Sequence, residues 1–233
     1  MTIIYEDNHI IAVNKTCSEI VQGDKTGDTP LSDMVKAYIK EKYNKPGDVF
    51  LGVPHRLDRP TSGVVLFART SKALSRLTAM FRNHGEIRKT YWAIVKRTAD
   101  MPSASSEEVI TLDNYIYRNE QQNKSYIVAP THKDAKRAIL SYRIIDCSER
   151  YQLVEIELQT GRHHQIRCQL AHVGMPIKGD LKYGYERSNP DGGICLHAKS
   201  IEFVHPVSRV PLKIVAPLPT TDIWNLFKNS QQA

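Results

Sequence analysis

The chain has 233 residues, with 32 lysines and arginines against 25 aspartates and glutamates, and a formal charge of +7. Its content of 41% hydrophobic and 24% charged residues is typical of a globular protein and excludes disordered and fibrous classes. The longest apolar run, residues 64–68, is far shorter than the roughly 20 residues of a membrane-spanning helix.

The first predicted elements are a hairpin and a helix. Two apolar, β-branched runs within residues 3–13 flank the turn formers of residues 6–9, which predicts an opening β-hairpin. Apolar residues recur with helical spacing over residues 31–42. Thr29 is the expected N-cap of that helix, and Pro30 is expected at its first position.

A second helix is predicted from Ser71 to Gly85, and strands dominate the rest of the chain. In residues 152–158 apolar and polar side chains alternate, as in a sheet with one covered face. The predicted strands are residues 63–69, 87–95, 125–129, 138–145, 152–158, 194–204 and 211–216. Because helices are too few for repeated strand–helix–strand units, we expect an α+β fold with flanking helices on a mainly antiparallel mixed sheet.

One domain over residues 1–233 is the expected organisation, and two lobes around a central cleft are the alternative. The polar residues 101–108 are the segment that would separate such lobes. The first residues carry acids and show neither a basic leader nor a small-residue cleavage site, so we expect a cytoplasmic protein.

The four cysteines and the positive charge give two further expectations. No CxxC pair is present, which argues against a zinc ribbon, a thioredoxin-like motif or a disulfide framework, so the thiols are expected to be reduced. The charge favours a polyanionic partner but does not by itself establish nucleic-acid binding. The cysteines are Cys17, Cys147, Cys168 and Cys195.

Polar and charged groups gather in residues 54–67, and Asp58 is at their centre. A carboxyl group has an ordinary pKa of about 3.9, so near neutral pH it can act as a nucleophile or a general base. Arg56 and Arg59 flank it with positive charge. The plainer alternative is a turn in which Asp58 pairs with an arginine. A kinase catalytic loop is excluded, because a leucine interrupts His-Arg-Asp and neither a glycine-rich loop nor a DFG motif is present.

Four segments together resemble the RluA family of pseudouridine synthases. Residues 55–63, HRLDRPTSG, resemble the HRLDxxTSG signature of that family, and residues 88–95 resemble its KxYxAxV motif. Taken alone, residues 88–95 are better interpreted as an amphipathic strand. Residues 160–177 resemble GRxHQIRxHxxxxGxPI, residues 179–184 match GDxxYG, and residues 196–206 resemble LHAxxLxFxHP. These ordered matches cover nearly the whole chain.

The resemblance implies a pseudouridine synthase fold and isomerisation of uridine in ribosomal or transfer RNA. It implies that Asp58 is the catalytic carboxylate and that Arg167 pairs with it. It gives Tyr91 a role in stacking and proton transfer, and Arg56 the role of filling the gap left by the everted nucleotide. Within this interpretation, Arg56 as a surface phosphate contact and Tyr91 as a core aromatic remain alternatives.

Two departures from the family pattern stand out. Residues 15–18 read Lys-Thr-Cys-Ser where relatives often have KPxG, and Gln169 replaces a second histidine. Both leave room for unusual substrate contacts. No segment resembles the additional amino-terminal RNA-binding domain of many relatives, so RNA selection is expected to rest on the core or on another protein.

We expect no metal and no organic cofactor, because the reaction includes no redox step. The adjacent His163 and His164 are the best metal pair, yet neighbouring side chains point to different sides and HExxH spacing is absent. Ile166 and Leu196 are interpreted as core residues. Five cations are candidates for the RNA backbone, namely Lys178, Lys182, Arg187, Lys199 and Arg209.

The expected partner is RNA, with no membrane, no obligate protein partner and a monomeric state. Two alternatives differ in chemistry from the isomerase. An RNA-binding or RNA-chaperone protein would keep the fold without turnover, and a nucleobase glycosylase would release free uracil. Asp58, Tyr91 and Arg167 argue against the pure binder.

Overall fold

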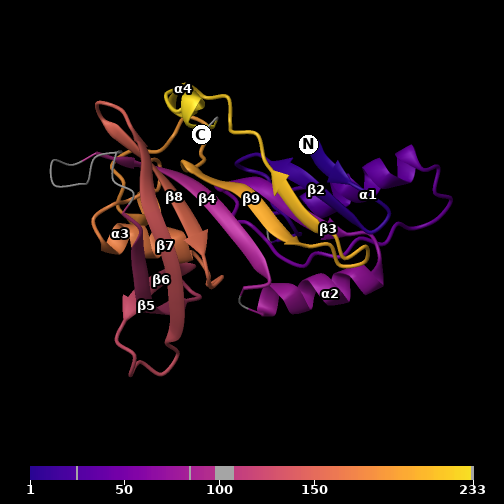
Figure 1. Cartoon of the computed structure of the whole chain (residues 1–233), viewed down its shortest axis with the longest axis horizontal. Coiled ribbons are helices and arrows are strands. Elements are labelled where there is room, and N and C mark those ends of the chain that lie inside the picture. The colour runs from indigo at the N-terminus through magenta and orange to yellow at the C-terminus, as the bar shows by residue number, and fades with distance from the viewer. Residues whose placement is uncertain (25, 84, 98–107, 232–233) are drawn as a thin grey trace. The chain divides into compact units, whose positions relative to one another are not determined.

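The computed structural model describes residues 1–24, 26–83, 85–97 and 108–231 (Figure 1). Contacts divide the chain into a first unit, Met1–Arg88 with Ala198–Pro217, and a second unit, Lys89–His197 with Leu218–Ala233. Residues 101–107 of the predicted polar loop lie outside the described residues. Within the described ranges, no helix combines the length and the apolar content needed to cross a membrane.

The first unit is built on strands that follow the order β1-β2-β3-β9, with β10 paired to β9. The pairs β1–β2, β2–β3 and β9–β10 are antiparallel, and the first of them is the predicted opening hairpin. Strands β2 and β3 are buried on both faces, because helices cover both. The strands are β1 (Thr2–Glu6), β2 (Ile10–Lys15), β3 (Ser62–Ala68), β9 (Leu196–Val204) and β10 (Pro211–Val215).

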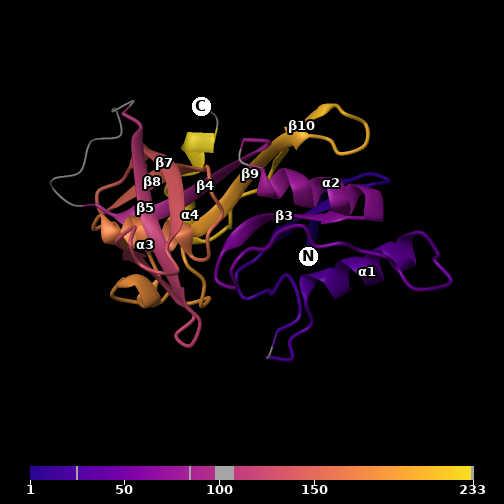
Figure 2. The same ribbon diagram turned by 90° about the horizontal axis from the view of Figure 1, so that it is seen from below.

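Helices α1 (Leu31–Lys42) and α2 (Ser71–Arg82) lie on opposite sides of β3 (Figure 2). The apolar stripe of α1, which includes Val35 and Ile39, packs on Val65 and Phe67 of β3. The helical spacing of these residues is what places them on one buried face. Both predicted helices are therefore confirmed.

The expected N-cap of α1 is wrong. Pro30, not Thr29, is the N-cap, and no side chain caps the helix. The backbone N–H groups of Leu31 and Ser32 instead donate to the carbonyls of Ile20 and Val21, at 2.7 and 3.1 Å. The first turn is thus satisfied by a neighbouring chain segment, which leaves a capping hydroxyl little to do.

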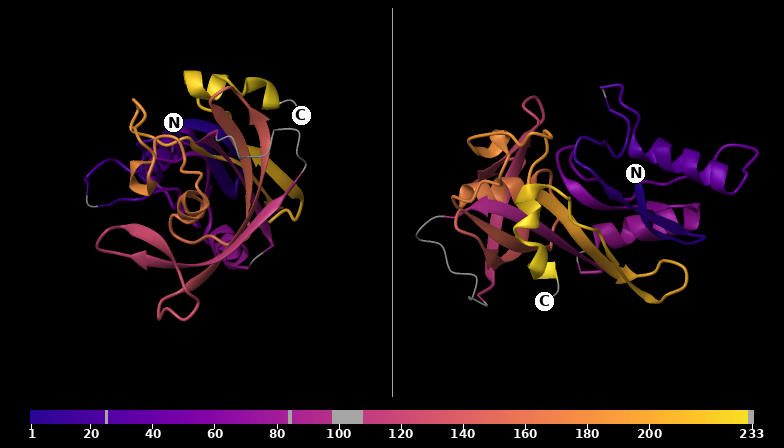
Figure 3. Two further views of the ribbon diagram at one scale, coloured as in Figure 1. Left: turned by 90° about the vertical axis from the view of Figure 1, so that its left-hand side faces the viewer. Right: turned by 90° about the horizontal axis from the view of Figure 1, so that it is seen from above.

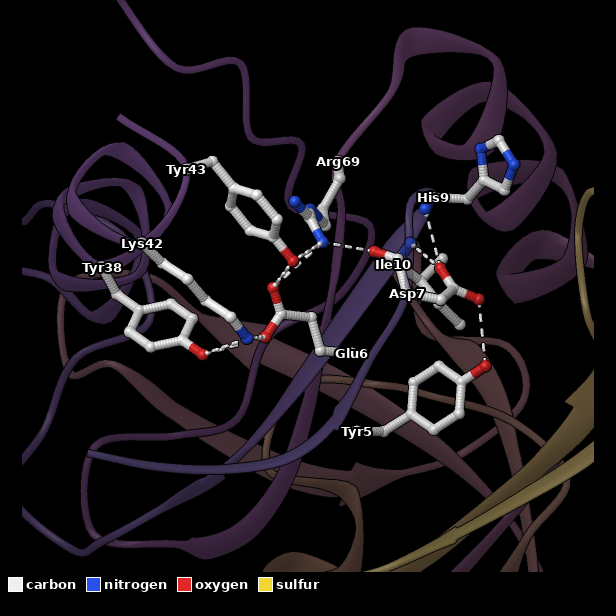
Figure 4. A network of polar contacts seen from close by, with 9 residues as sticks. All are labelled: Tyr5, Glu6, Asp7, His9, Ile10, Tyr38, Lys42, Tyr43 and Arg69. Atoms are coloured by element: carbon white, nitrogen blue, oxygen red, sulfur yellow. Dashed lines mark hydrogen bonds and ion pairs between the residues drawn. The ribbon is translucent and has the colours of Figure 1, made fainter. Parts of the chain in front are cut away.

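A polar network fixes the end of α1 to the start of the chain (Figure 4). The carboxylate of Glu6 accepts from Lys42 at 2.7 Å, from Tyr43 at 2.8 Å and from Arg69 at 3.0 Å. The guanidinium of Arg69 lies 4.6 Å from the centroid of the Tyr43 ring. These contacts hold the pKa of the Glu6 carboxyl below its ordinary value against the opposing effect of burial.

The second unit contains five strands, in the order β4-β8-β7-β5-β6, and all four neighbouring pairs are antiparallel. The predicted one-sided burial of β8 holds from Val154 to Leu158, whereas Gln152 and Leu153 are both buried. Strand β5 was not predicted. The strands are β4 (Ile87–Lys96), β5 (Ile110–Asn119), β6 (Lys124–Val128), β7 (Lys136–Cys147) and β8 (Tyr151–Leu158).

Short helices complete the second unit. Helix α3 (Gln165–His172) contacts β5 and β6, and it is the orange helix in the left view of Figure 3. Its Ile166 and Leu170 join one core with Trp224 and Phe227, which follow near the C-terminus. The remaining helical segments are η1 (Leu181–Tyr183), α4 (Asp222–Asn225) and η2 (Lys228–Gln231). The architecture is the expected α+β fold of mainly antiparallel strands with flanking helices.

Candidate active site

Asp58 lies in the loop that leads into β3, and its side chain is half-buried. Its carbonyl accepts from the N–H of Thr61 at 3.0 Å, which closes a turn over Arg59 and Pro60. Arg56, two residues before it, is exposed and forms no hydrogen bond or ion pair with another described residue. The loop therefore presents a carboxylate and an available guanidinium on one short segment.

Lys15 holds this loop in place from the end of β2. Its side chain is 1% exposed, and its ammonium donates to the carbonyls of Thr16, Arg59 and Thr61 at 3.0, 2.9 and 2.7 Å. Burial lowers the pKa of Lys15 to about 8, although the nearby charges of Glu19 and Asp58 act in the opposite direction. Sequence reasoning missed this role. The signal was a lysine directly after an apolar strand.

Gly63 is required where the loop enters β3. Its φ is +115°, and a Cβ there would lie 2.3 Å from the carbonyl oxygen of Ala198. No L side chain fits both conditions. The close approach of β9 thus explains the glycine that ends the HRLDRPTSG segment.

Two neighbours of Asp58 have structural partners. Nε2 of His55 accepts from the N–H of Leu66 at 2.9 Å, and its ring stacks on Phe81 with centroids 4.4 Å apart. The guanidinium of Arg59 donates to Asp28 at 2.7 Å. Arg59 therefore pairs with an exposed acid on another loop.

Tyr91 lies on β4 in the second unit, opposite Ile156 of β8. It is partly buried and packs against the core of that unit. Nearby, burial lowers the pKa of Lys89 below its ordinary value. The expected stacking and proton-transfer role of Tyr91 stays a prediction.

Arg167 lies on α3 and forms a buried ion pair with Asp180. Its Nε and Nη2 donate to the two carboxylate oxygens of Asp180 at 2.7 and 2.8 Å, and the side chains are 5% and 1% exposed. The guanidinium carbon lies 5.1 Å from the centroid of the Tyr183 ring. Sequence reasoning missed Asp180, although it belongs to the GDxxYG segment. Pairing of Arg167 with Asp58 stays a prediction.

The segment before α3 is shaped by two buried side chains. Oε1 of Gln165 accepts from Thr160 Oγ1 at 2.8 Å and from the N–H of Arg162 at 3.0 Å. Nδ1 of His164 lies 3.0 Å from the Tyr183 hydroxyl. Burial, reinforced by the charge of Arg167, lowers the pKa of His164 to about 2. His164 is therefore neutral, and its Nδ1 shares a hydrogen bond with the Tyr183 hydroxyl.

The expectation that His163 and His164 point to different sides is wrong. Their rings stack with centroids 3.7 Å apart, because His164 has a φ of +51° and interrupts the regular backbone. The ring nitrogens of His163 face Ser125 and Asn123 at 2.9 and 3.1 Å. No group of three or more possible metal ligands occurs in the described part of the chain.

The two departures from the family pattern have structural consequences. Ser18, at the glycine position of KPxG, adopts a φ of +73° and donates its N–H to Arg59 at 3.1 Å. Gln169 is fully buried, and its Nε2 contacts Leu112 O, Asn114 Oδ1 and Ala138 O at 2.8 to 3.3 Å. Gln169 therefore joins α3 to β5 and β7, and unusual substrate contacts at the two departures stay a prediction.

The remaining candidates divide into core and surface. Ile166 and Leu196 are 4% exposed core residues, as expected. Lys178 donates to Asn189 at 2.6 Å, and Lys199 is partly buried with its pKa lowered by burial. A role of the five candidate cations in tracking RNA stays a prediction.

Comparison with known proteins supports one family. The family model described as RNA pseudouridylate synthase matches residues 9–172. Ribosomal large subunit pseudouridine synthase D of Xylella fastidiosa is 32% identical over 94% of this chain and 66% of its own length. tRNA pseudouridine synthase C of Vibrio cholerae is 33% identical over 96% of this chain and 93% of its own length.

The fold agrees with solved structures. Human RNA Pseudouridylate Synthase Domain Containing 4 covers 99% of this chain and 92% of its own, with a TM-score of 0.75 and 23% identity. Human RNA Pseudouridylate Synthase Domain Containing 1 gives a TM-score of 0.67 over 100% of this chain and 95% of its own, at 19% identity. The chain therefore belongs to the RNA pseudouridylate synthase family and is an isomerase that converts uridine in RNA to pseudouridine.

Proposed function

We propose that this enzyme modifies specific uridines of structured ribosomal or transfer RNA, with Asp58 as its catalytic carboxylate. The observation that carries the proposal is the structure of the Asp58 loop. Its carboxylate is half-buried and lies within the segment that the family model matches. The buried ammonium of Lys15 holds the backbone of this loop by hydrogen bonds. The similar proteins include enzymes named for ribosomal and for transfer RNA, which supports these two substrate classes. Target bases in exposed loops can be turned out of the stack.

The chemistry breaks the N-glycosidic bond, turns the uracil and joins its carbon 5 to the sugar, while the proton of carbon 5 is released. Asp58 attacks either the sugar or the uracil ring, and both routes remain open. Tyr91 offers a ring for stacking and a hydroxyl for proton transfer. Flipping a base costs a few kcal/mol, and stacking on an aromatic ring returns about 1–3 kcal/mol, so Tyr91 offsets part of the extraction.

Arg56 is proposed to fill the space left by the everted nucleotide. Its exposure and its lack of a described hydrogen-bond or ion-pair partner support this role. Replacement by lysine separates the alternatives. A phosphate contact survives Arg56→Lys, whereas a planar group that replaces a base does not. A rate for Arg56→Lys near that of the unaltered enzyme would refute gap filling.

The central test uses RNA labelled with tritium on carbon 5 of uracil, because isomerisation releases the label. We expect release by the unaltered enzyme, and we expect Asp58→Asn to abolish release while RNA affinity changes little. Asp33→Asn, on the exposed face of α1, is the matched control and should retain full activity. Retained turnover in Asp58→Asn would refute the role of Asp58. Free uracil among the products would instead identify a glycosylase.

We further propose that residues 1–233 act as one catalytic domain and as a monomer, without an obligate protein partner. Light scattering of the purified enzyme during gel filtration tests this. A mass of two chains at the concentrations used for the activity measurement would contradict it.

A further inference from the structure

A polar groove of about 780 Å³ lies in the second unit, beside the segment that leads into α3. Its walls come from β5, β6, the start of β7 and residues 161–163. Ligand sites in proteins have volumes of about 300–1,000 Å³, so the groove is large enough for part of a polymer chain. Nothing in the proposed chemistry of Asp58 or Tyr91 uses it.

Three cations line the groove from three separate segments, namely Arg118 on β5, Lys136 on β7 and Arg162 before α3. The strand register places two of them on one face. Lys136 is opposite Ile116, and Ile116 shares a face with Arg118 because side chains two residues apart point the same way. That face also carries Ser125, the partner of Arg118 across β5 and β6.

These three cations have no carboxylate partner among the described residues. Arg137, the neighbour of Lys136, pairs with Asp113, and Arg143 pairs with Glu155 at 2.8 Å. By contrast, Arg118 and Lys136 form no ion pair, and Arg162 donates only its Nε to a backbone carbonyl, at 2.9 Å. Unpaired guanidinium and ammonium groups that converge on a groove are suited to phosphate oxygens.

The groove also contains Glu120 and Asp134, both exposed, so its charge is mixed. Neither forms an ion pair with the three cations in the described structure. The floor is held rigid: Ser125 Oγ donates to the carbonyl of His163 at 2.7 Å and faces its ring nitrogen at 2.9 Å. Residues 161–163 lead directly into α3, whose third residue is Arg167.

We propose that this groove binds the ribose-phosphate backbone of the substrate RNA, with Arg118, Lys136 and Arg162 contacting phosphates. The inference rests on the proposed function, since it names where that function's substrate is held. Glu120 and Asp134 repel phosphates, so the phosphate contacts are assigned to the three cations.

The test measures RNA affinity against salt concentration by fluorescence anisotropy, with a stem-loop RNA as the probe. Each of Arg118→Gln, Lys136→Gln and Arg162→Gln should reduce the slope of log K against log salt by about 0.7–0.9, and the triple variant by about 2 to 3. The RNA concentration for half-maximal label release should rise. Glu120→Gln with Asp134→Asn should tighten binding.

Arg137→Gln is the matched control, since it removes the same charge from the adjacent position on the other face of β7. Its salt slope should stay within about 0.3 of the unaltered value on this scale. An unchanged slope in the folded triple variant would overturn the groove proposal. If RNA binding follows the groove charges but no label is released, the groove stands and the proposed function fails.

Discussion

The loop of Asp58 and the helix of Arg167 hold opposite charges by different means. Around Asp58, the buried ammonium of Lys15 donates hydrogen bonds to three backbone carbonyls. The side chain of Asp58 itself is only half-buried. Arg167 is buried, and a carboxylate from a later loop engages one whole edge of its guanidinium. The proposed catalytic carboxylate is thus partly exposed, whereas the charge of Arg167 is part of the core.

This difference predicts which substitutions lower the stability of the protein and which lower its activity. Substitutions that unpair the buried charge should unfold the second unit, because an isolated buried ion is strongly penalised. Substitutions that alter the Asp58 loop act on backbone geometry, so their cost depends on φ angles and unpaired carbonyls. Substitutions that test this contrast are taken from the largest expected effect to the smallest.

Arg167→Ala should lower the free energy of unfolding by about 3–5 kcal/mol, because it leaves Asp180 charged and unpaired. It should also abolish turnover. Urea unfolding measures the first effect and label release the second. Arg143→Ala, which breaks an exposed pair, should cost at most about 1 kcal/mol. Equal costs for the two variants would contradict the assigned burial of the Arg167 pair.

A double variant separates folding from function at the same site. Arg167→Met with Asp180→Leu replaces the pair by apolar groups and should regain most of the lost stability. Label release should remain absent. A stable double variant that still turns over would remove Arg167 from the proposed machinery.

Gly63→Ala should destabilise by about 3 kcal/mol, since it adds an unfavourable positive φ to a clash with the backbone of Ala198. Gly85→Ala is the control, because Gly85 has a similar φ of +95° and nothing within 4 Å of the added Cβ. It should cost about 1 kcal/mol. Thermal unfolding measures the loss of stability in each variant. Equal losses would show that the backbone of β9 shifts to accommodate the added methyl group.

Lys15→Met should cost about 2–3 kcal/mol, because three carbonyls around the Asp58 turn lose their donor. The exposed Lys36→Met should change the free energy of unfolding by less than about 0.5 kcal/mol. Activity should fall with Lys15→Met, since the loop loosens. An unaltered rate of label release by Lys15→Met at saturating RNA would show that the geometry of the Asp58 loop does not depend on the Lys15 ammonium.

The same lysine gives a pH effect of defined sign. Its pKa is about 8 when folded and near 10.4 when unfolded, so between these values the unfolded chain binds more protons. The contribution of Lys15 to stability therefore rises from pH 8 to pH 10, and the gap between the unaltered protein and Lys15→Met should widen there. A constant gap would contradict the lowered pKa.

Elements with a clear period were predictable, whereas β5 and α3 were not. In β5 only Ile116 is fully buried, so neither alternation nor an apolar run marks the strand. Residues 165–170 of α3 are all buried, which removes the polar face that identifies a helix. Burial imposed by the rest of the fold, not local preference, determines both elements.

Single candidate residues of the site could be named from the sequence, whereas the buried partners of Arg167 and Lys15 could not. Asp58 stands out as a carboxylate in a dense polar segment. Asp180 is 13 residues from Arg167, and the Thr61 carbonyl is 46 residues from Lys15, so their pairing depends on the folded chain. Lys15 and Asp180 can be seen in the sequence, but the groups that they contact cannot.

His164 provides the smallest predicted effect and a test of the buried side of the comparison. Its pKa is about 2 when folded and near 6.5 when unfolded, so on acidification only the unfolded chain takes up its proton. This residue should therefore lower stability by about 2 kcal/mol between pH 7.5 and pH 5. His164→Asn, which suits the positive φ, should show a shallower acid slope. His132→Asn, at an exposed histidine, should keep the original slope. Equal slopes for all three proteins would mean that His164 accepts a proton in the folded state. The assignment of a neutral His164 in contact with Tyr183, before Arg167, would then be wrong.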